Sequence, residues 1–159
     1  MRQRIRSSIW TLTLISFLIF LVIFNINSFI SGPLNVQNYQ DRQILNLMLD
    51  KYLYLKGEIV SRYSYEEVYY VAKVEIEAAD YLVWYDLNSS VIYKALYETY
   101  DETTILHQAQ NQHVLEDPKI VLGIYKNEPI YLVYDQHIEL RYSYLTKELL
   151  SIYYKEVRL

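Results

Sequence analysis

The stretch "EVYYVAKVEIE" at residues 67–77 decides the fold class of this chain. Apolar residues occupy every second position, and mostly charged or aromatic residues stand between them. An alternation with a period of two is typical of a β-strand that has one face against a core. The core face comprises Val68, Tyr70, Ala72, Val74 and Ile76, and the opposite face comprises Glu67, Tyr69, Val71, Lys73 and Glu75.

Neighbouring stretches extend this strand into a sheet. "EIVSRYSY" (residues 58–65) precedes it, and "DYLVWYD" (residues 80–86) and "VIYKALY" (residues 91–97) follow it. All three are rich in β-branched and aromatic residues and are separated by polar turns, so the sequence predicts four antiparallel strands. Before them, apolar residues recur on one helical face and Gly57 follows as a C-cap, which predicts an amphipathic helix over residues 40–56.

The second half repeats this order of helix and strands. Asp101 is a good N-cap residue and opens the helical stretch "DETTILHQAQNQH", with Glu102 in its first turn. After Pro118, alternating stretches and a closing hairpin predict another antiparallel sheet. Its third strand directs Ile138, Leu140, Tyr142 and Tyr144 to the core and His137, Glu139, Arg141 and Ser143 to solvent.

The two halves are similar at an offset of about 60 residues, since "DRQIL" begins at Asp41 and "DETTIL" at Asp101. The sequence therefore predicts an α+β fold of two repeats, residues 39–100 and 101–159, each with one helix packed on an antiparallel sheet. Units of this size seldom have adequate cores alone, so we expect the two repeats to pack on each other.

The N-terminal part is far more apolar than the rest. "IWTLTLISFLIFLVIFNINSFI" (residues 9–30) contains no charge, and as a helix it would be roughly 33 Å long, enough for a bilayer core of roughly 30 Å. It predicts a transmembrane helix. A cleaved signal peptide is the first alternative, although its apolar region is usually shorter and ends at a pair of small residues. A buried core helix is the second, although it would need one polar side.

Basic residues set the expected orientation. Arg2, Arg4 and Arg6 precede the apolar stretch, and positive flanks stay in the cytoplasm. We therefore expect a single-pass protein of the cell membrane with a cytoplasmic tail over residues 1–8, attached to the membrane by its N-terminal helix. "SGPLNVQN" (residues 31–38) is uncharged, contains Gly32-Pro33, and predicts a short tether to an extracellular part.

Composition excludes several kinds of chemistry. Of the 15 basic residues, 12 follow the apolar stretch, against all 19 acidic residues, and such an acidic part disfavours nucleic acid as a partner. The chain has no cysteine for disulfides, thiolate catalysis or thiolate metal sites. Its three glycines form no phosphate-binding loop or nucleophile elbow. We expect no catalytic residues and no cofactor.

The histidines and carboxylates also lack a functional pattern. His107 and His113 are six positions apart, so they would point to different sides of a helix rather than hold a metal ion together. His137 stands alone in a predicted strand. Glu75 and Glu77 alternate with apolar residues, as on the solvated face of a strand, so they do not predict a glycosidase pair. We therefore expect no metal site and no enzymatic activity.

Tyrosine is the remaining anomaly, with 19 residues, all after the apolar stretch. Several lie on predicted core faces, but Tyr69 and Tyr153 fall on the opposite faces. A tyrosine ring can be buried while its hydroxyl stays wet, which suits a protein interface. The outward face of the second sheet is therefore the predicted interaction surface, with Tyr69, Arg141 and Tyr153 as its candidate residues.

Two hairpins in the second half carry a resemblance to a known family. "LGIYKNEPIYLVY" (residues 122–134) and "YSYLTKELLSIYYK" (residues 142–155), together with the order of basic tail, apolar stretch and two repeats, resemble the TseB (YpmB) family of Gram-positive bacteria. The resemblance implies two PepSY-like repeats of the kind found in cell-wall elongation regulators. It also implies a non-enzymatic role, in which the chain regulates peptidoglycan synthesis by binding a penicillin-binding protein or another wall-synthesis membrane protein.

Other hypotheses remain open at this stage. PepSY-type domains also occur in protease propeptides, so an inhibitor or chaperone-like regulator of a secreted protease is the alternative function. An enzyme with an unrecognised site is a third hypothesis. The family supplies no catalytic or ligand residues that could be carried over to positions in this chain.

Overall fold

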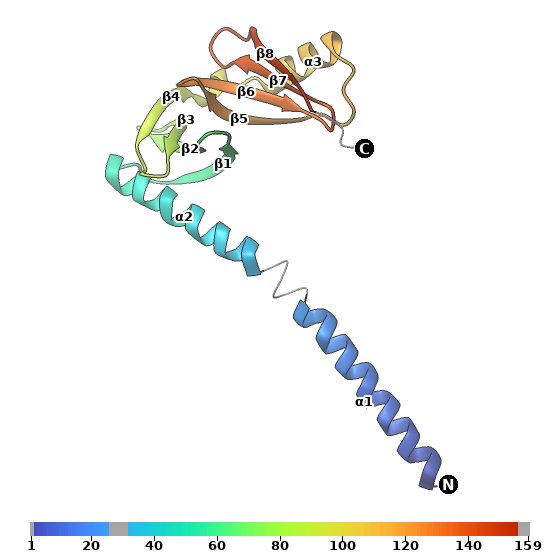
Figure 1. Ribbon diagram of the computed structural model, residues 1–159. Coiled ribbons are helices and arrows are strands. Elements are labelled where there is room, and N and C mark those ends of the chain that lie inside the picture. The colour runs from blue at the N-terminus through green and yellow to red at the C-terminus, as the bar shows by residue number, and fades with distance from the viewer. Residues whose placement is uncertain (1, 26–31, 156–159) are drawn as a thin grey trace. The chain divides into compact units, whose positions relative to one another are not determined.

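The computed structural model describes residues 2–25 and 32–155, and the side chains of residues 14–25 and 35–155 (Figure 1). The chain divides into two compact units, Met1–Arg42 and Gln43–Leu159. The elements in chain order are α1 (Arg2–Asn25), α2 (Gly32–Tyr52), β1 (Gly57–Ser64), β2 (Val68–Ile76), β3 (Ala79–Asp86), β4 (Val91–Leu96), the 3₁₀ turn η2 (Tyr97–Thr99), α3 (Glu102–Gln112), β5 (Lys119–Tyr125), β6 (Glu128–Tyr134), β7 (Ile138–Ser143) and β8 (Leu149–Tyr154).

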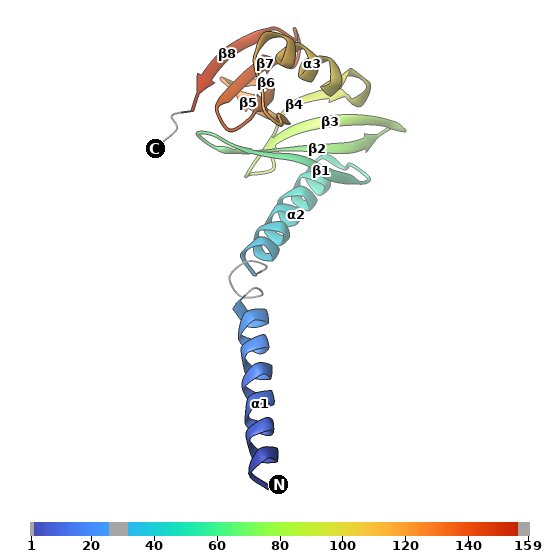
Figure 2. The ribbon, with the colours of Figure 1, turned by 90° about the vertical axis from the view of Figure 1, so that its right-hand side faces the viewer.

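The eight strands form two antiparallel sheets, each ordered as the strands follow in the chain. Sheet A has the order β1-β2-β3-β4, and sheet B has the order β5-β6-β7-β8 (Figures 1 and 2). The α+β class and the two antiparallel sheets agree with the prediction, and each sheet has four strands, but the transmembrane helix that the same prediction included is not found among the described residues. The stretch that decides the fold class forms β2, which is the partner of both β1 and β3.

The outer face of sheet A packs against α2. Leu45 and Met48, one helical turn apart, are buried against Tyr70, Ala72 and Val74 of β2. This is the apolar set that the period of two predicted. The apolar stripe of the helix and the apolar face of the strand thus cover each other.

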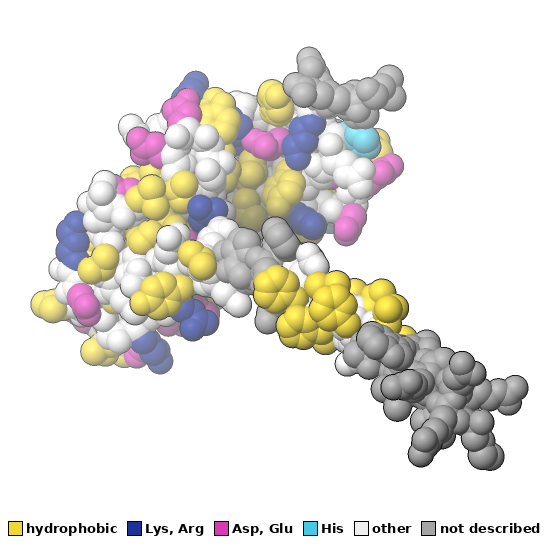
Figure 3. Space-filling model, turned by 60° about the horizontal axis from the view of Figure 1, so that its bottom comes forward, with side chains coloured by type: hydrophobic (Ala, Val, Ile, Leu, Met, Phe, Trp, Pro, Cys, Tyr) yellow, Lys and Arg dark blue, Asp and Glu magenta, His cyan; other side chains and the backbone are white. Residues whose placement is uncertain are grey.

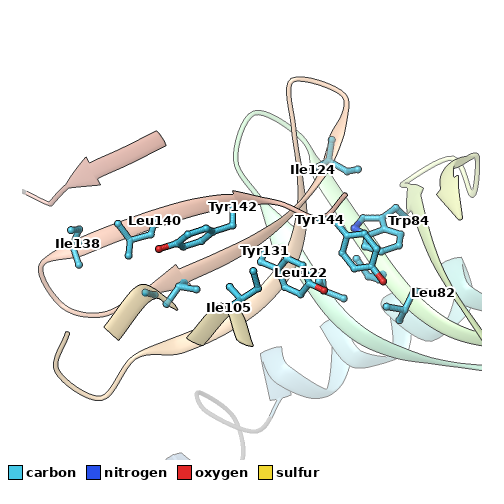
Figure 4. Packing of buried hydrophobic residues seen from close by; sticks show 13 residues of the cluster. Leu82, Trp84, Ile105, Leu122, Ile124, Tyr131, Ile138, Leu140, Tyr142 and Tyr144 are labelled. Atoms are coloured by element: carbon cyan, nitrogen blue, oxygen red, sulfur yellow. The ribbon is translucent and has the colours of Figure 1, made fainter. Parts of the chain in front are cut away.

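The opposite face of β2 is also buried, which the alternation did not predict. Val71 is fully buried and belongs to a core that includes Leu82 and Trp84 of sheet A together with residues of sheet B and α3. The ring of Trp84 meets that of Tyr144 at a centroid distance of 4.8 Å, and Figure 4 shows these two rings side by side. The two halves therefore share a core, and the expectation that they pack on each other is confirmed.

Helix α3 covers sheet B on the side of this shared core. Its N-cap is Asp101, as the sequence predicted, and the Asp101 carboxylate accepts a hydrogen bond from the backbone N–H of Thr104 at 3.1 Å. Ile105 and Ala109, one turn apart, are its buried residues. They pack in the cluster with Leu140 and Tyr142 of β7 (Figure 4).

Strands β1 and β5 join the two sheets at their edges. A β-bulge between Ile59 and Ser61 exchanges the faces of β1, so that Ser61 turns toward sheet B. The Ser61 hydroxyl donates a hydrogen bond of 2.6 Å to the carbonyl of Leu122. Two residues further on, the ring of Tyr63 lies over Gly123, where a side chain would have no room.

The predicted membrane span is wrong. Within the part of the chain that the structure describes, no helix combines the length and the apolar character that crossing a membrane requires. Helix α1 begins at Arg2 and ends at Asn25. The described helix covers residues 9–25 of the predicted apolar stretch. Residues 26–30 of that stretch lie outside the described residues.

The first unit differs from the prediction in two more respects. The expected single-pass topology depended on the span and is corrected with it. Residues 32–38, which we expected to form a tether, belong instead to α2, whose last residue is Tyr52 rather than residue 56. The apolar side chains described for α1, from Leu14 to Phe24, are exposed and gather along this helix in Figure 3.

Replacement of Gly123 by alanine tests the packing between β1 and β5. The added Cβ would lie 2.7 Å from two ring atoms of Tyr63, so the ring would have to move. We expect Gly123→Ala to lower the free energy of unfolding by about 1–3 kcal/mol, as overpacking does, in a denaturant titration. In a Tyr63→Ala background the same change should cost much less. Equal costs in the two backgrounds would contradict this packing.

Asp135 provides a pH-dependent contact in the link between β6 and β7. Its carboxylate accepts hydrogen bonds from the backbone N–H groups of Glu116, His137 and Ile138, at 2.7–2.9 Å. Burial alone would raise the pKa of Asp135, but the three N–H donors together outweigh it and hold this pKa below its ordinary value. The ionised form is therefore the one that the folded chain stabilises.

The pH dependence of stability tests this arrangement. A lowered pKa in the folded state gives stabilisation that is complete above the unfolded pKa of about 3.9 and is lost as the pH falls through the folded pKa. We expect Asp135→Asn to be less stable than the parent at pH 7 and to differ less from it at pH 3. Parallel stability curves for the two proteins across this range would show that the carboxylate has no such role.

Candidate interaction surface

Arg141 is buried on the face of sheet B that we expected to be open. It retains 6% of its accessible surface, and its guanidinium lies between the rings of Tyr65 and Tyr125, with Cζ 4.5 Å from each ring centroid. The prediction that Arg141 faces solvent is therefore wrong. The covering rings belong to the β1–β2 turn and to the end of β5. The alternation of residues along β7 cannot predict contacts with these other segments.

Glu139 neutralises the buried guanidinium. It lies two residues before Arg141 on the same face of β7, and its Oε1 accepts hydrogen bonds from Arg141 Nε at 3.0 Å and from Nη2 at 2.6 Å. Burial by itself would lower the pKa of Arg141, but the hydrogen bonds to Glu139 and the nearby hydroxyls raise it overall. The guanidinium is thus charged, paired with Glu139 and in contact with two aromatic rings.

Tyr63 lies beside this pair. Its side chain packs with Ile130 and Leu132, and its hydroxyl is buried with no hydrogen-bond partner in the described part of the chain. Burial raises the pKa of Tyr63, and the positive charge of Arg141 acts in the opposite direction. The hydroxyl therefore stays protonated next to a charged group. Unsatisfied polar atoms of this kind are rare in native cores.

A groove of about 270 Å³ opens next to the covering rings. The rings of Tyr65 and Tyr125 meet edge to face, with centroids 6.3 Å apart, and form part of its wall. Tyr69, one of the predicted residues, also lines the groove, and its hydroxyl donates to Glu67 at 2.9 Å. The lining residues are Tyr65, Glu66, Tyr69, Ile124, Tyr125, Lys126 and Asn127.

Tyr153 lies on the same face of sheet B as Arg141. In the register of β7 and β8, Tyr153 is opposite Glu139, and Ser151 is opposite Arg141. The Tyr153 side chain is 58% exposed. The structure therefore places Arg141 and Tyr153 on one sheet face and Tyr69 in the groove beside it. We call the set Tyr65, Tyr69, Tyr125, Arg141 and Tyr153 the tyrosine face.

Sequence analysis missed Tyr65 and Tyr125, the two residues that make this surface. Both lie next to turns, and the sequence placed Tyr65 at the end of the predicted strand over residues 58–65, just before a polar turn. The feature of the sequence that could have indicated them is a tyrosine next to charged turn residues. Burying part of such a large ring is favourable, so it tends to pack against another side chain. Tyr65 is 56% exposed even with the guanidinium against one side of it.

Lys147 is a second charged side chain in contact with aromatic rings, and it lies where the two halves of the chain meet. The ammonium of Lys147 donates to the Tyr131 hydroxyl at 2.7 Å and to the carbonyl of Thr99 at 3.3 Å, and it lies over the rings of Tyr131 and Tyr144. Burial lowers the pKa of Lys147, and the charge of Asp101 opposes this shift. The Tyr131 hydroxyl also accepts from the backbone N–H of Asp101 at 3.0 Å. These contacts fix the start of α3 on sheet B.

The other predicted residues form no site. Within residues 2–25 and 32–155, no three metal-ligating side chains lie close enough to hold an ion. His107 is exposed on α3, where its Nδ1 is 3.0 Å from the amide nitrogen of Asn111. Arg2, Arg4 and Arg6, predicted to set membrane orientation, lie in the first turns of α1, and their side chains are outside the described part.

Comparison with known proteins assigns this chain to no family. No family model matches the chain, and no curated protein matches it. One similar solved structure is the crystal structure of a protein provisionally described as a lipoprotein, from Clostridium difficile 630. It is 13% identical, the match covers 70% of this chain and 90% of that one, and the TM-score is 0.34. A likeness of this strength carries no argument about fold or function.

Replacement of Arg141 by lysine tests whether the planar guanidinium holds the tyrosine face together. Lysine keeps the charge but cannot place a planar group against an aromatic ring or donate from two nitrogens to Glu139. We expect Arg141→Lys to lower the free energy of unfolding by about 1.5–3 kcal/mol, the range for a hydrogen bond to a charged group. The exposed Arg42 on α2 offers a control, and Arg42→Lys should change stability by less than about 0.5 kcal/mol. Equal effects at both positions would contradict the packing role.

Proposed function

We propose that the unit Gln43–Leu159 is a non-catalytic binding module that regulates cell-wall elongation by binding a penicillin-binding protein or another wall-synthesis membrane protein. Two features support the proposal. The hairpins of the second half resemble those of cell-wall elongation regulators, and the tyrosine face is suited to a protein partner. The proposal requires this unit to lie outside the cytoplasm, where wall synthesis takes place.

The observation that carries the proposal is the fixed position of the exposed aromatic rings. Arg141 is paired with Glu139 and lies against Tyr65 and Tyr125, so these rings have little freedom to lose when a partner binds. Tyrosine and arginine are enriched among the residues that dominate binding energy. Tyr65 and Tyr153 are both more than half exposed, so they are available for contact.

The shape of the surface favours a protein rather than a small metabolite. The groove next to Tyr125, of about 270 Å³, is at the lower end of the usual size of small-molecule pockets, roughly 300–1,000 Å³. Its wall combines aromatic rings with one acidic and one basic residue, Glu66 and Lys126. A cavity of this size suits the insertion of one large side chain from a partner. The surrounding sheet face would then supply the rest of the contact.

Crosslinking in living cells tests the proposed partner. A photoactivatable residue in place of the exposed Glu66, at the rim of the groove, should capture a penicillin-binding protein or another wall-synthesis protein. The same residue in place of Ile92, on the far sheet, should not capture it. Failure to recover any wall-synthesis protein from position 66, with normal wall growth in a deletion strain, would refute the proposal.

Two tyrosine substitutions test the surface itself. We expect Tyr65→Ala and Tyr153→Ala each to weaken binding of the captured partner by about 2 kcal/mol, or roughly 30-fold in Kd, as for central interface residues. Tyr154→Ala is the matched control, because Tyr154 is 68% exposed but lies on the opposite face of β8. If Tyr154→Ala weakens binding as much as Tyr153→Ala does, the tyrosine face is not the contact.

A further inference from the structure

The turn that follows α2 has a leucine where helices usually have glycine. The backbone N–H of Tyr54 donates to the carbonyl of Leu49 at 2.9 Å. The backbone N–H of Leu53 donates to the carbonyl of Asp50 at 3.4 Å. Together these hydrogen bonds form a Schellman motif, in which the residue just after the helix end adopts the left-handed conformation. That residue is Leu53, with a φ of 57°.

The left-handed conformation is unfavourable for leucine. A Cβ atom then lies too close to the following carbonyl oxygen, so this position favours glycine or asparagine. Among the described residues with positive φ, Leu53 is the one with a large apolar side chain. Backbone strain of this kind persists mainly where the residue has a functional role. Packing within the fold does not explain the choice of leucine, because Leu53 is 88% exposed.

A second leucine in the same turn is almost as exposed. Leu55 is 82% exposed, and we call Leu53 and Leu55 the leucine tip. The tyrosines beside them are attached to the fold. Tyr54 packs against the core beneath α2, and the Tyr52 hydroxyl accepts a hydrogen bond from the backbone N–H of Val91 at 3.1 Å. The two tyrosine rings also stack, with centroids 5.8 Å apart. The turn is therefore fixed by its tyrosines, while its leucines remain in contact with solvent.

Lysines stand on both sides of the leucine tip. Residues 51–56, "KYLYLK", begin and end with lysine and contain no acidic residue. The Lys51 ammonium donates to the Ser90 hydroxyl at 3.2 Å. The Lys56 ammonium pairs with Glu75 at 2.8 Å, but the Lys56 side chain remains 77% exposed. Lysine can lay its aliphatic stem along an apolar surface and keep its ammonium in water. Leucines flanked by tyrosines and lysines are typical of segments that lie at the interface between a bilayer and water.

We propose that the leucine tip inserts into the interfacial region of a lipid bilayer, with Lys51 and Lys56 at the level of anionic headgroups. Burial of the two leucines supplies the driving force, and the negative headgroups attract the lysines. A protein interface of ordinary size buries about 800 Å² on each partner, far more than one turn offers, whereas lipid tails can close around a protruding side chain. Two leucines bind only weakly and reversibly, so the test must report local depth. This inference goes beyond the proposed function and does not rest on it.

A label at one position of the full chain tests this contact. The natural chain has no cysteine, so Leu55→Cys can carry a single polarity-sensitive fluorophore. On vesicles of phosphatidylcholine and phosphatidylglycerol we expect its fluorescence to rise about twofold or more as the label leaves water, and a quencher on the lipid tails to reverse the rise. Vesicles of phosphatidylcholine alone should give a smaller rise, because they lack the charge that attracts the lysines. Val114→Cys is the matched control, because Val114 is 96% exposed between α3 and β5, and its label should not respond.

Replacement of Leu53 by glycine separates lipid contact from a structural role. Glycine suits the left-handed position, so the melting temperature of Leu53→Gly should be equal to or higher than that of the parent. The vesicle response of the label at position 55 should nevertheless fall by about half or more, because one of the two inserting side chains is gone. No response to either kind of vesicle, an equal response at position 114, or an unchanged response in Leu53→Gly would overturn the proposal. A lower melting temperature of Leu53→Gly, or a photoactivatable residue at position 53 that captures protein but no lipid in cells, would do the same.

Discussion

Burial of β2 on both faces is the constraint on which the rest of the compact unit depends. Tyr70, Ala72 and Val74 lie against α2, while Val71 on the opposite face lies in the core shared with sheet B and α3. A strand buried on both sides must have a layer on each. Helix α2 supplies one layer, and the second half of the chain supplies the other. The two similar halves are therefore joined by a common core rather than linked in series.

Tyrosine side chains make up much of this common core. Rings of Tyr93, Tyr131 and Tyr144 cluster around Trp84 and around one another, at centroid distances of 4.8–6.4 Å. Large rings bury much area per residue, and their hydroxyls can still reach polar partners at the edge of the core. The hydroxyl of Tyr131 bonds to Asp101 and Lys147, and that of Tyr144 to Thr99. A small unit without disulfides can hold two sheets together in this way.

The tyrosine face uses the same chemistry at the surface. A guanidinium paired with Glu139 and placed between Tyr65 and Tyr125 fixes rings that would otherwise move freely. Sheet B thus presents rigid aromatic groups on one face.

The sequence alone determined the local elements, because helical and strand periodicity are properties of the backbone. The alternation around Val74 predicted β2, and Asp101 predicted the start of α3. Only the tertiary structure decided that Val71 is buried and that Arg141 is covered by two tyrosines. Both outcomes depend on segments distant in the sequence, and a pattern within one strand contains no information about what packs against its second face.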